Sequence, residues 1–445
     1  MKYIRLAAVL LMAGTLPLRA QTPDTVRLTL GGAARMAAEQ NSQVLEARYR
    51  VEQARARVTS TKSSLLPQLG AIANQSSHTF NTATFGIDFP SAPGEPPLFD
   101  PNGEVLGPVK LTDVRGRLSQ TLFDWSAIER VRSANAAVEA ADAQMQAAAQ
   151  RAGTGAANAY VQAFRAQQLY QSRLADVSLA QELVGFAKQQ LQSGTGVKLD
   201  VTRAEAQLAT VNSQMISARN AVDRAKLALV RALNLPATTK LLLTDSLPLN
   251  AHAALDADEA LRAALANRAD IRALEAQIKT AELQSSATRA ERLPNLNFVG
   301  DDGWIGKNTS HMLHTYDWAV QISVPVFQGF RSKAREQEER AQINELQARR
   351  RDMEQQFGFD VRSAVLDVNA AQEQVDAAGT RLHLAEQELA DARERFQSGV
   401  AGTADVVTAS LRLNDARTAY TDALVGYQTA RVALATAEGN VTELP

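Results

Sequence analysis

The sequence predicts a mainly α-helical protein with a transmembrane β-barrel portion, built from one helix–strand–strand–long helical hairpin unit that occurs twice. The first observation is an internal repeat, in which residues 28–69 align without a gap with residues 255–296. The second is a pair of long, proline-free segments with helical spacing of apolar residues, at 128–192 and 332–397. The third is a set of short segments that alternate apolar and polar residues. A duplicated supersecondary unit indicates one symmetric object rather than separate domains.

The composition excludes several functional classes. The chain has 445 residues and a formal net charge of −1, so bulk electrostatics does not recruit nucleic acid. It contains no cysteine, which excludes disulfides, thiolate metal sites, a cysteine nucleophile and a lipid anchor on an N-terminal cysteine. Aromatic residues make up only 5%, while alanine and glutamine are abundant, as is typical of long, closely packed helices.

The first 20 residues are predicted to form a secretory signal peptide, with an ordinary N-terminal helix as the alternative. Lys2 and Arg5 give a basic start, a short apolar core follows, and Leu18-Arg19-Ala20 is a suitable cleavage site. After this segment no run approaches about 20 apolar residues, so no transmembrane helix is expected. The predicted division is signal peptide 1–20, first repeat 21–235, irregular linker 236–254 and second repeat 255–445.

Each repeat is expected to begin with one helix, at about 29–62 in the first copy and about 257–290 in the second. Both segments are rich in alanine, glutamate, glutamine and arginine, which favour helices. Pro67 and Pro294 follow the ends of these helices, because proline moves the preceding residue out of the α region.

Strands are expected next, at 65–85, 109–123, 293–306 and 315–327. The clearest alternation runs over 318–326, where large apolar side chains point one way and Ala319, Gln321 and Ser323 the other. A wall with one apolar and one polar face is what a barrel between lipid and water requires. A small sheet outside a membrane is the alternative interpretation. Residues 86–108, rich in proline, glycine and acidic residues, are interpreted as a loop.

Two very long helices follow the strand pairs. Segments 128–192 and 332–397 contain no proline, and at 1.5 Å per residue each spans on the order of 100 Å. Their return partners, 200–234 and 405–438, are about half as long, so the first helix of a repeat is expected to stack end to end on a return helix. Apolar residues spaced by three and four predict coiled-coil packing. The return helices show this spacing at Val201, Ala204, Leu208 and Val211, and at Val406, Ala409, Leu413 and Ala416.

Each long hairpin turns at a glycine and continues with an Asp-Val pair. Gln192-Ser193-Gly194 precedes Asp200-Val201, and Gln397-Ser398-Gly399 precedes Asp405-Val406. A glycine just past a helix end supplies a left-handed cap, and the aspartate is placed to cap the next helix with its side chain. A turn that is used twice at the far end of a long rod is also expected to be a docking tip.

The strand count predicts an oligomer. Four strands cannot close a barrel, and no sheet edge can remain unpaired in lipid. The smallest barrels of this kind have about eight strands, so at least two chains must contribute. Two copies and three copies both satisfy this requirement.

The order of these features resembles the TolC-like exit ducts of the outer membrane efflux protein family. The resemblance covers about residues 28–440 and rests on three motifs: Leu-Pro before a strand, Val324-Pro325-Val326-Phe327-Gln328-Gly329 after one, and the duplicated Gly-to-Asp-Val turns. It implies a homotrimer with a twelve-stranded barrel in the outer membrane of a Gram-negative bacterium and a twelve-helix tunnel in the periplasm. It also implies two partners, an inner-membrane pump and a periplasmic adaptor, and a closed tip that opens when they engage.

The resemblance also implies roles for residues at the tip. The residues that match the tip gate are Asp200, Asp405 and the aromatic Phe396. The residues assigned to adaptor docking are Gly194, Gly399, Val201 and Val406. Ala401 stands where some members carry a gate-locking arginine, and Thr408 stands where they carry a second selectivity aspartate. The resemblance thus implies a gate without that lock and with a thinner ring of negative charge.

The expected function is passive conduction of small molecules or proteins from pump and adaptor to the exterior, with no catalysis, cofactor or metal. His311 and His314 have metal-like spacing but fall in a short polar turn, and Asp301-Asp302 is interpreted as a water-facing position or a bend of the barrel. One alternative is a periplasmic helical-hairpin adaptor, but this chain has two hairpins and a strand pair in each repeat. Another is a secreted enzyme, which predicts a cluster of convergent polar residues that the sequence does not show.

Overall fold

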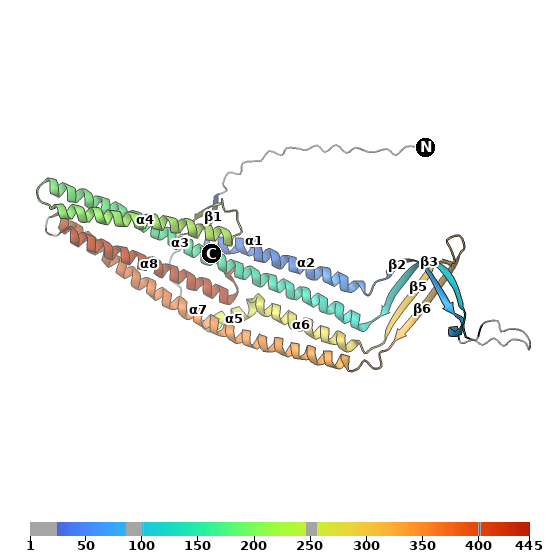
Figure 1. The fold of residues 1–445 in the computed structure, drawn as a ribbon. Coiled ribbons are helices and arrows are strands. Elements are labelled where there is room, and N and C mark those ends of the chain that lie inside the picture. The colour runs from blue at the N-terminus through green and yellow to red at the C-terminus, as the bar shows by residue number, and fades with distance from the viewer. Residues whose placement is uncertain (1–24, 86–99, 101, 246–255, 399, 401) are drawn as a thin grey trace, which may run out of the picture.

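The chain forms an elongated molecule, with helical rods along most of its length and a β-sheet at one end (Figure 1). The computed structural model describes residues 25–445 apart from 86–99, 101, 246–255, 399 and 401. The predicted signal peptide, most of the predicted loop, residues 246–254 of the predicted linker, and Gly399 and Ala401 of the second tip lie outside the described residues. Within the described part, no helix combines the length and the apolar character that a membrane span needs.

Four antiparallel strands form the sheet, in the order β2 (Gln68–Asn81), β3 (Val105–Phe123), β5 (Asn295–Gly306) and β6 (Met312–Ser323). The pairing of β3 with β5 joins the two repeats. Several boundaries differ from the prediction. β6 begins at Met312, so His314 lies in this strand and not in the predicted polar turn. β3 begins inside the segment interpreted as a loop, because its first residues pair with the end of β2, where Asn81 lies opposite Val105. β6 ends at Ser323, so residues 324–327 lie outside the sheet.

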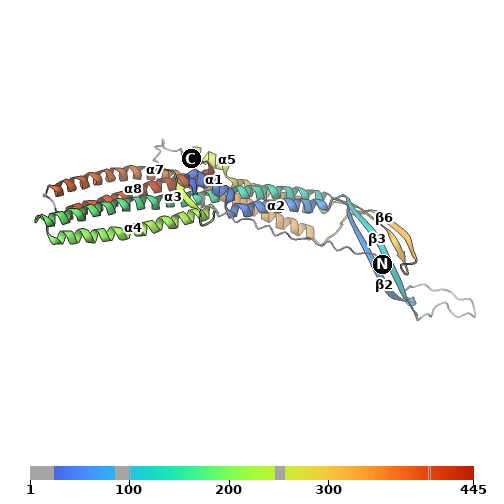
Figure 2. The same ribbon diagram turned by 90° about the horizontal axis from the view of Figure 1, so that it is seen from above.

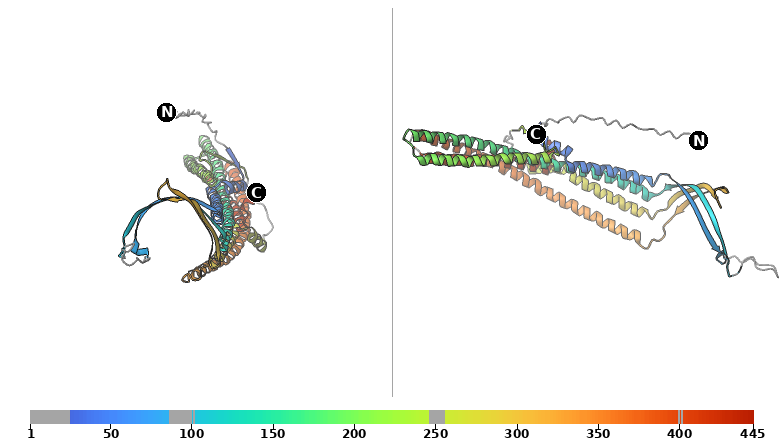
Figure 3. Two further views of the ribbon diagram at one scale, coloured as in Figure 1. Left: turned by 90° about the vertical axis from the view of Figure 1, so that its right-hand side faces the viewer. Right: turned by 45° about the horizontal axis from the view of Figure 1, so that its top comes forward.

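The two faces of the sheet differ in polarity, as the alternation predicted. The apolar face carries large side chains that are 42–69% exposed: Val114, Trp304, Trp318, Val320 and Ile322. On the other face, Arg115 lies 2.8 Å from Asp113 and 2.7 Å from Asp301. The sheet is strongly curved (Figure 3), and the low exposure of these three charged side chains, 13–22%, indicates that the polar face is the concave one.

The long helices lie where the sequence predicts them. α3 (Trp125–Gln192) and α7 (Arg331–Gln397) run from the sheet to the far end of the molecule, and α4 (Lys198–Ala232) and α8 (Thr403–Glu438) return about half way (Figure 1). The predicted seams face inward, with Ala204 and Val211 of α4 buried against α3 and Val406 and Ala409 of α8 buried against α7. Because alanines recur in both seams, the paired helices can approach closely at these positions.

The prediction of a single first helix in each repeat is wrong, because two helices occupy that segment in each copy. α1 (Leu30–Gln40) and α2 (Ser42–Ser63) are separated by Asn41, and α5 (Ala257–Asn267) and α6 (Ala269–Ala290) are separated by Arg268. Asn41 has φ −60° and ψ 141°, and its side chain accepts a hydrogen bond from the Gln43 amide at 2.9 Å, so it caps α2. One extended residue is enough to turn the chain, and helical periodicity on both sides of it hides the break.

The predicted end-to-end stacking of helices is present in both repeats. The Asn41 side chain donates to the Ala232 carbonyl at 2.9 Å, and Asn234 donates to the Gln40 carbonyl at 3.0 Å, which joins the end of α4 to the start of α2 (Figure 2). In the second repeat, Arg268 donates to the Ala437 carbonyl at 3.4 Å and joins the end of α8 to the start of α6. Carbonyl groups left free at the end of one helix thus accept hydrogen bonds from side chains beside the helix that stacks on it.

A small belt of structure, formed by β1 (Thr25–Leu28), β4 (Lys240–Leu243), α1 and the turn η2 (Val441–Glu443), lies beside the middle of the rods. β1 pairs in parallel with β4, and η2 packs on α1. β4 corrects the prediction of an irregular linker at 236–254. Three consecutive leucines hide the alternation that buries Leu241 and Leu243 and leaves Leu242 exposed. The belt therefore arises from contacts between segments more than 200 residues apart, such as Leu28 opposite Leu243.

Tyr160 of α3 anchors this belt, and its titration gives a testable pH dependence. Its hydroxyl donates to the Leu28 carbonyl at 3.2 Å and accepts from the Asp245 amide at 3.3 Å. Burial raises the pKa of Tyr160 from 10.0 to about 12. Because the folded state disfavours the ionised phenol, its contribution to stability is complete below pH 10 and is lost as pH rises through the folded pKa.

We therefore expect Tyr160→Phe to lower the free energy of unfolding by about 1–3 kcal/mol at neutral pH, because two hydrogen bonds are lost. The difference in melting temperature between the two proteins should shrink between pH 10 and pH 12, where only the wild type carries this titrating group. Circular dichroism melts of both proteins across this range measure the difference. A gap that stays constant up to pH 12 would contradict the assigned burial.

Candidate functional site at the tips of the helical hairpins

The first tip is a tight turn between α3 and α4 that glycine makes possible. Gly194 has φ 79°, the left-handed conformation expected from the sequence. The amides of Thr195 and Gly196 both donate to the Gln190 carbonyl, at 3.0 and 2.9 Å, and so close the end of α3. A Cβ atom at Gly194 would meet nothing within 4 Å, so the turn needs glycine for its backbone conformation and not for space.

The two tip aspartates do not cap their helices as the sequence predicted. α4 and α8 begin at Lys198 and Thr403, and their N-caps are Val197 and Gly402, without a side-chain cap. Asp200 and Asp405 therefore lie at the third helical position, inside the first turn. A carboxylate there still interacts favourably with the positive end of the helix dipole. Asp200 also lies 3.9 Å from Arg203.

The aromatic residue matched to the gate is buried within the chain. Phe396 is 4% exposed, and its ring centroid lies 5.4 Å from that of Phe186 on α3. It belongs to an apolar cluster in which Leu183 of α3 meets the second hairpin, at Ala385, Leu389, Val406, Ala409, Leu413 and Ala416. Phe396 thus joins the α7–α8 hairpin to α3 close to the tip.

The valines matched to docking are also covered. Val406 is fully buried in the same cluster as Phe396, and Val201 is half-buried beside Ala187 and Ala204. Thr408 is exposed, and its hydroxyl donates to the Ala404 carbonyl at 2.8 Å. Gly194 and Asp405 thus lie at the surface and Asp200 is half-buried, while Val201 and Val406 support the turns from below.

Ion pairs tie the two hairpins together above the tips. Glu182 of α3 lies 3.0 Å from Arg393 of α7, and Arg165 of α3 lies 2.7 Å from Asp422 of α8. Asp176 of α3 lies 3.1 Å from Arg173 and 3.9 Å from Arg417 of α8. Burial raises the pKa of the Asp176 carboxyl, and the two arginines oppose that rise. The exposed pairs contribute little to stability, so the buried apolar cluster carries most of the attachment.

The sequence reasoning missed an exposed apolar patch at the tips. Leu191, Val197 and Leu199 around the first turn are 40–57% exposed, and Val400 in the second turn is 71% exposed. An apolar N-cap at Val197, where a polar residue would stabilise the helix, was the signal available in the sequence. Exposed apolar residues gathered at one end of an elongated molecule indicate an interaction surface.

Asp301, Asp302 and His314 of the sheet each form an ion pair or hydrogen bond with a neighbouring side chain. Asp301 lies on the polar face beside Arg115. The expectation of a water-facing pair does not extend to Asp302, because that residue shares the apolar face with Trp304. Asp302 lies on the opposite face, 2.6 Å from the Nε2 atom of His314, whose ring lies 5.7 Å from that of Trp304. Among the described residues, no group of three His, Cys, Asp or Glu side chains is placed to hold a metal ion.

Comparisons with known proteins agree with this architecture. The chain is 26% identical over 320 residues to the protein CyaE of Bordetella pertussis, covering 69% of this chain and 67% of that protein. Its fold matches the CmeC outer membrane channel of Campylobacter jejuni with a TM-score of 0.75 and 17% identity, over 92% of this chain and 85% of that one. It also matches the outer membrane protein VceC of Vibrio cholerae with a TM-score of 0.73 and 19% identity, over 92% and 96% of the two chains.

A third structural match is the MtrE outer membrane channel of Neisseria gonorrhoeae, with a TM-score of 0.69 and 20% identity, over 93% of this chain and 89% of that one. The family described as "Outer membrane efflux protein" matches residues 33–235 and 260–440, which are most of the two repeats. The predicted fold class, a duplicated helical and barrel-forming unit, is thereby confirmed. The chain belongs to the outer membrane efflux protein family, and it is an outer-membrane channel that extends into the periplasm.

Proposed function

We propose that the chain assembles as a homotrimer that passively conducts cargo from an inner-membrane pump and a periplasmic adaptor to the exterior. The observation that carries this proposal is a four-stranded curved sheet with two unpaired edges, joined to long helical hairpins that are also open on both sides. In this proposal residues 1–20 direct export, and repeats 21–235 and 255–445 each supply one strand pair and one hairpin.

The edges require further copies of the chain. β2 and β6 each pair with only one described strand, and in a membrane an unpaired strand edge costs several kcal/mol per backbone group. The helices also form one layer with two open edges. α2 and α4 lie at the edge that corresponds to β2, and α7 lies at the edge that corresponds to β6. Because the two edges differ, joining them head to tail generates a ring. Family membership favours three copies, which give twelve strands.

Exposed apolar side chains mark the helical edges for this contact. Along α7, the helix face that points away from α8 carries Phe359, Leu366 and Leu384, which are 72%, 69% and 59% exposed. On the opposite edge, α4 exposes Ile216 and Leu227 at 64% and 53%. Two such stripes on complementary edges support the burial of α7 against α4 of the next protomer.

We further propose that the tips control access to the duct. In the ring, Asp200 and Asp405 of each chain line the tip opening, while Phe396 holds the second hairpin against α3 in the closed state. Ala401 and Thr408 remove the lock and the second acidic ring found in some relatives, so in this chain the apolar cluster around Phe396 takes over closure. The MtrE structure is described as an open state, which supports a family gate with two positions.

Adaptor docking is proposed at the exposed turns, at Gly194 and Gly399 together with the apolar patch around the first turn. Val201 and Val406 support these turns from below, because one is half-buried and the other is fully buried. Docking that moves the turns would be transmitted along the helices to the cluster around Phe396, since Phe396 and Val406 belong to one cluster.

The assembly is tested with purified protein in detergent and in planar lipid bilayers. We expect the wild type to elute with three times the chain mass and to form ion-conducting pores. Phe359→Asp with Leu366→Asp should release monomers, because each carboxylate would have to be buried at an interface. The control is Arg272→Asp on α6, which changes the net charge equally on a helix with neighbours on both sides. A monomeric wild type, or trimers in the double variant, would contradict the proposal.

A further inference from the structure

The helices near the sheet enclose a hollow on one side of their layer. Its volume is about 500 Å³, and its lining includes side chains from α2, α3, α6 and α7. In the layer these helices follow one another in that order, so α2 and α7 are not neighbours. Side chains from the first and the last helix reach one hollow only on the concave side of a curved layer. In the ring proposed above, the concave side faces the lumen.

This hollow has an excess of positive charge. Its charged lining residues are Glu46, Arg50, Arg151, Asp270 and Arg349. Both acids already have arginine partners, since Glu46 lies 3.8 Å from Arg50 and Asp270 lies 2.7 Å from Arg268 outside the lining. Arg151 and Arg349 are exposed, and no ion pair or hydrogen bond links either side chain to another described residue. Two arginines of each chain therefore present free guanidinium groups to the solvent in the hollow.

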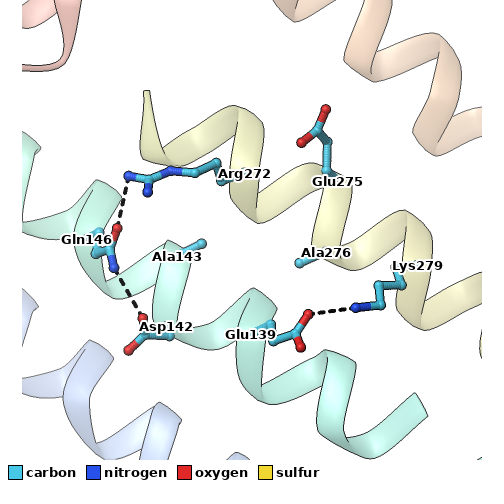
Figure 4. A pocket seen from close by; sticks show the side chains of 8 residues that line it. All are labelled: Glu139, Asp142, Ala143, Gln146, Arg272, Glu275, Ala276 and Lys279. Carbon is cyan, nitrogen blue, oxygen red and sulfur yellow. Dashed lines mark hydrogen bonds and ion pairs between the residues drawn. The ribbon is translucent and has the colours of Figure 1, made fainter. Parts of the chain in front are cut away.

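The opposite side of the same helices differs in the charge of its lining and in the pairing of its cationic side chains. There a groove of about 420 Å³ between α3 and α6 is lined by Glu139, Asp142, Arg272, Glu275 and Lys279, with Gln146 (Figure 4). Lys279 lies 3.0 Å from Glu139, and Arg272 donates to Gln146 at 3.0 Å (Figure 4). Its cationic side chains both have partners, and acids outnumber bases. Of these two linings, only the one on the concave side contains arginines without a partner among the described residues.

We propose that the hollow bounded by Arg151 and Arg349 is an anion subsite of the duct, which takes multivalent phosphate or carboxylate groups. This inference rests on the proposed trimeric channel, in which symmetry places three copies of the hollow around one lumen. The planar guanidinium group matches carboxylate and phosphate oxygens in a bidentate geometry and keeps its charge at all physiological pH values. Low-dielectric walls around a ring of like charges concentrate counter-ions. The cargo class that the subsite favours is therefore anionic.

The test uses trimers of the full-length protein in planar bilayers at low salt, with inorganic pyrophosphate added to the barrel side. Pyrophosphate should block the wild-type current. Arg151→Gln with Arg349→Gln should need on the order of tenfold more pyrophosphate for half block, because six charges leave the ring. Arg151→Lys with Arg349→Lys keeps the charges and should retain block. The block should fade at high salt in every variant.

The matched control is Arg272→Gln with Lys279→Gln, which removes the same charge from the opposite wall and should be blocked like the wild type. The inference is overturned if the glutamine pair Arg151→Gln with Arg349→Gln is blocked at wild-type concentrations, or if the control loses as much block as that pair. A wild type that inserts but does not conduct overturns the proposed channel itself, and the subsite with it. A conducting wild type without pyrophosphate block overturns the subsite alone.

Discussion

Val197→Asp with Leu199→Asp is expected to abolish efflux while the trimer stays assembled. Both side chains are exposed at the first tip, at 57% and 55%. Aspartate at the N-cap and in the first turn is favourable for α4, so the fold is not weakened. If a partner buries both residues, their replacement removes about 3 kcal/mol or more per protomer, which is roughly a hundredfold in affinity.

The measurement is dye accumulation in cells that produce the pump, the adaptor and this channel together, with detergent mass analysis of the purified variant. The control, Gln192→Asp with Lys198→Gln, changes the net charge of the same tip equally but leaves the apolar patch intact. The control should export dye as the wild type does. Normal export by the Val197 and Leu199 variant would show that the apolar patch is not the docking surface.

Phe396→Ala is expected to loosen the gate and raise the conductance of the closed channel several-fold. The side chain is 4% exposed in the cluster that joins the second hairpin to α3, so its truncation leaves a cavity and costs about 3–5 kcal/mol. The remaining ties near the tip include an exposed ion pair between Glu182 and Arg393, which contributes little. Single-channel recording in planar bilayers measures the change, and sensitivity of cells to a large antibiotic measures the leak.

Phe357→Ala provides a matched control on the same helix. Phe357 is also 4% exposed, and the Arg268 guanidinium lies over its ring at 3.3 Å. It lies about 60 Å from Phe396 along α7, at 1.5 Å per residue. Both variants should lose comparable stability, but only Phe396→Ala should change the closed conductance. An equal rise in conductance in both would mean that general destabilisation, and not the tip attachment, controls the gate.

Local patterns in the sequence were sufficient for most of the fold. The repeat, the long helices, the coiled-coil seams and the two-faced strands all follow from the spacing of residue types within one segment. The left-handed Gly194 could be predicted because only the residue itself and its neighbours determine a helix end. The family followed from the order and duplication of these features, although each motif alone is weak.

Only the tertiary structure decided the features that depend on contacts between distant segments. The break at Asn41 is completed by the Ala232 carbonyl, 191 residues away, and β4 forms because β1 lies beside it. The burial of Phe396 and the meeting of Arg151 with Arg349 in one hollow depend on how α3 packs against the second hairpin and against α6. Periodicity determines which face of a helix is apolar, but packing determines what that face meets.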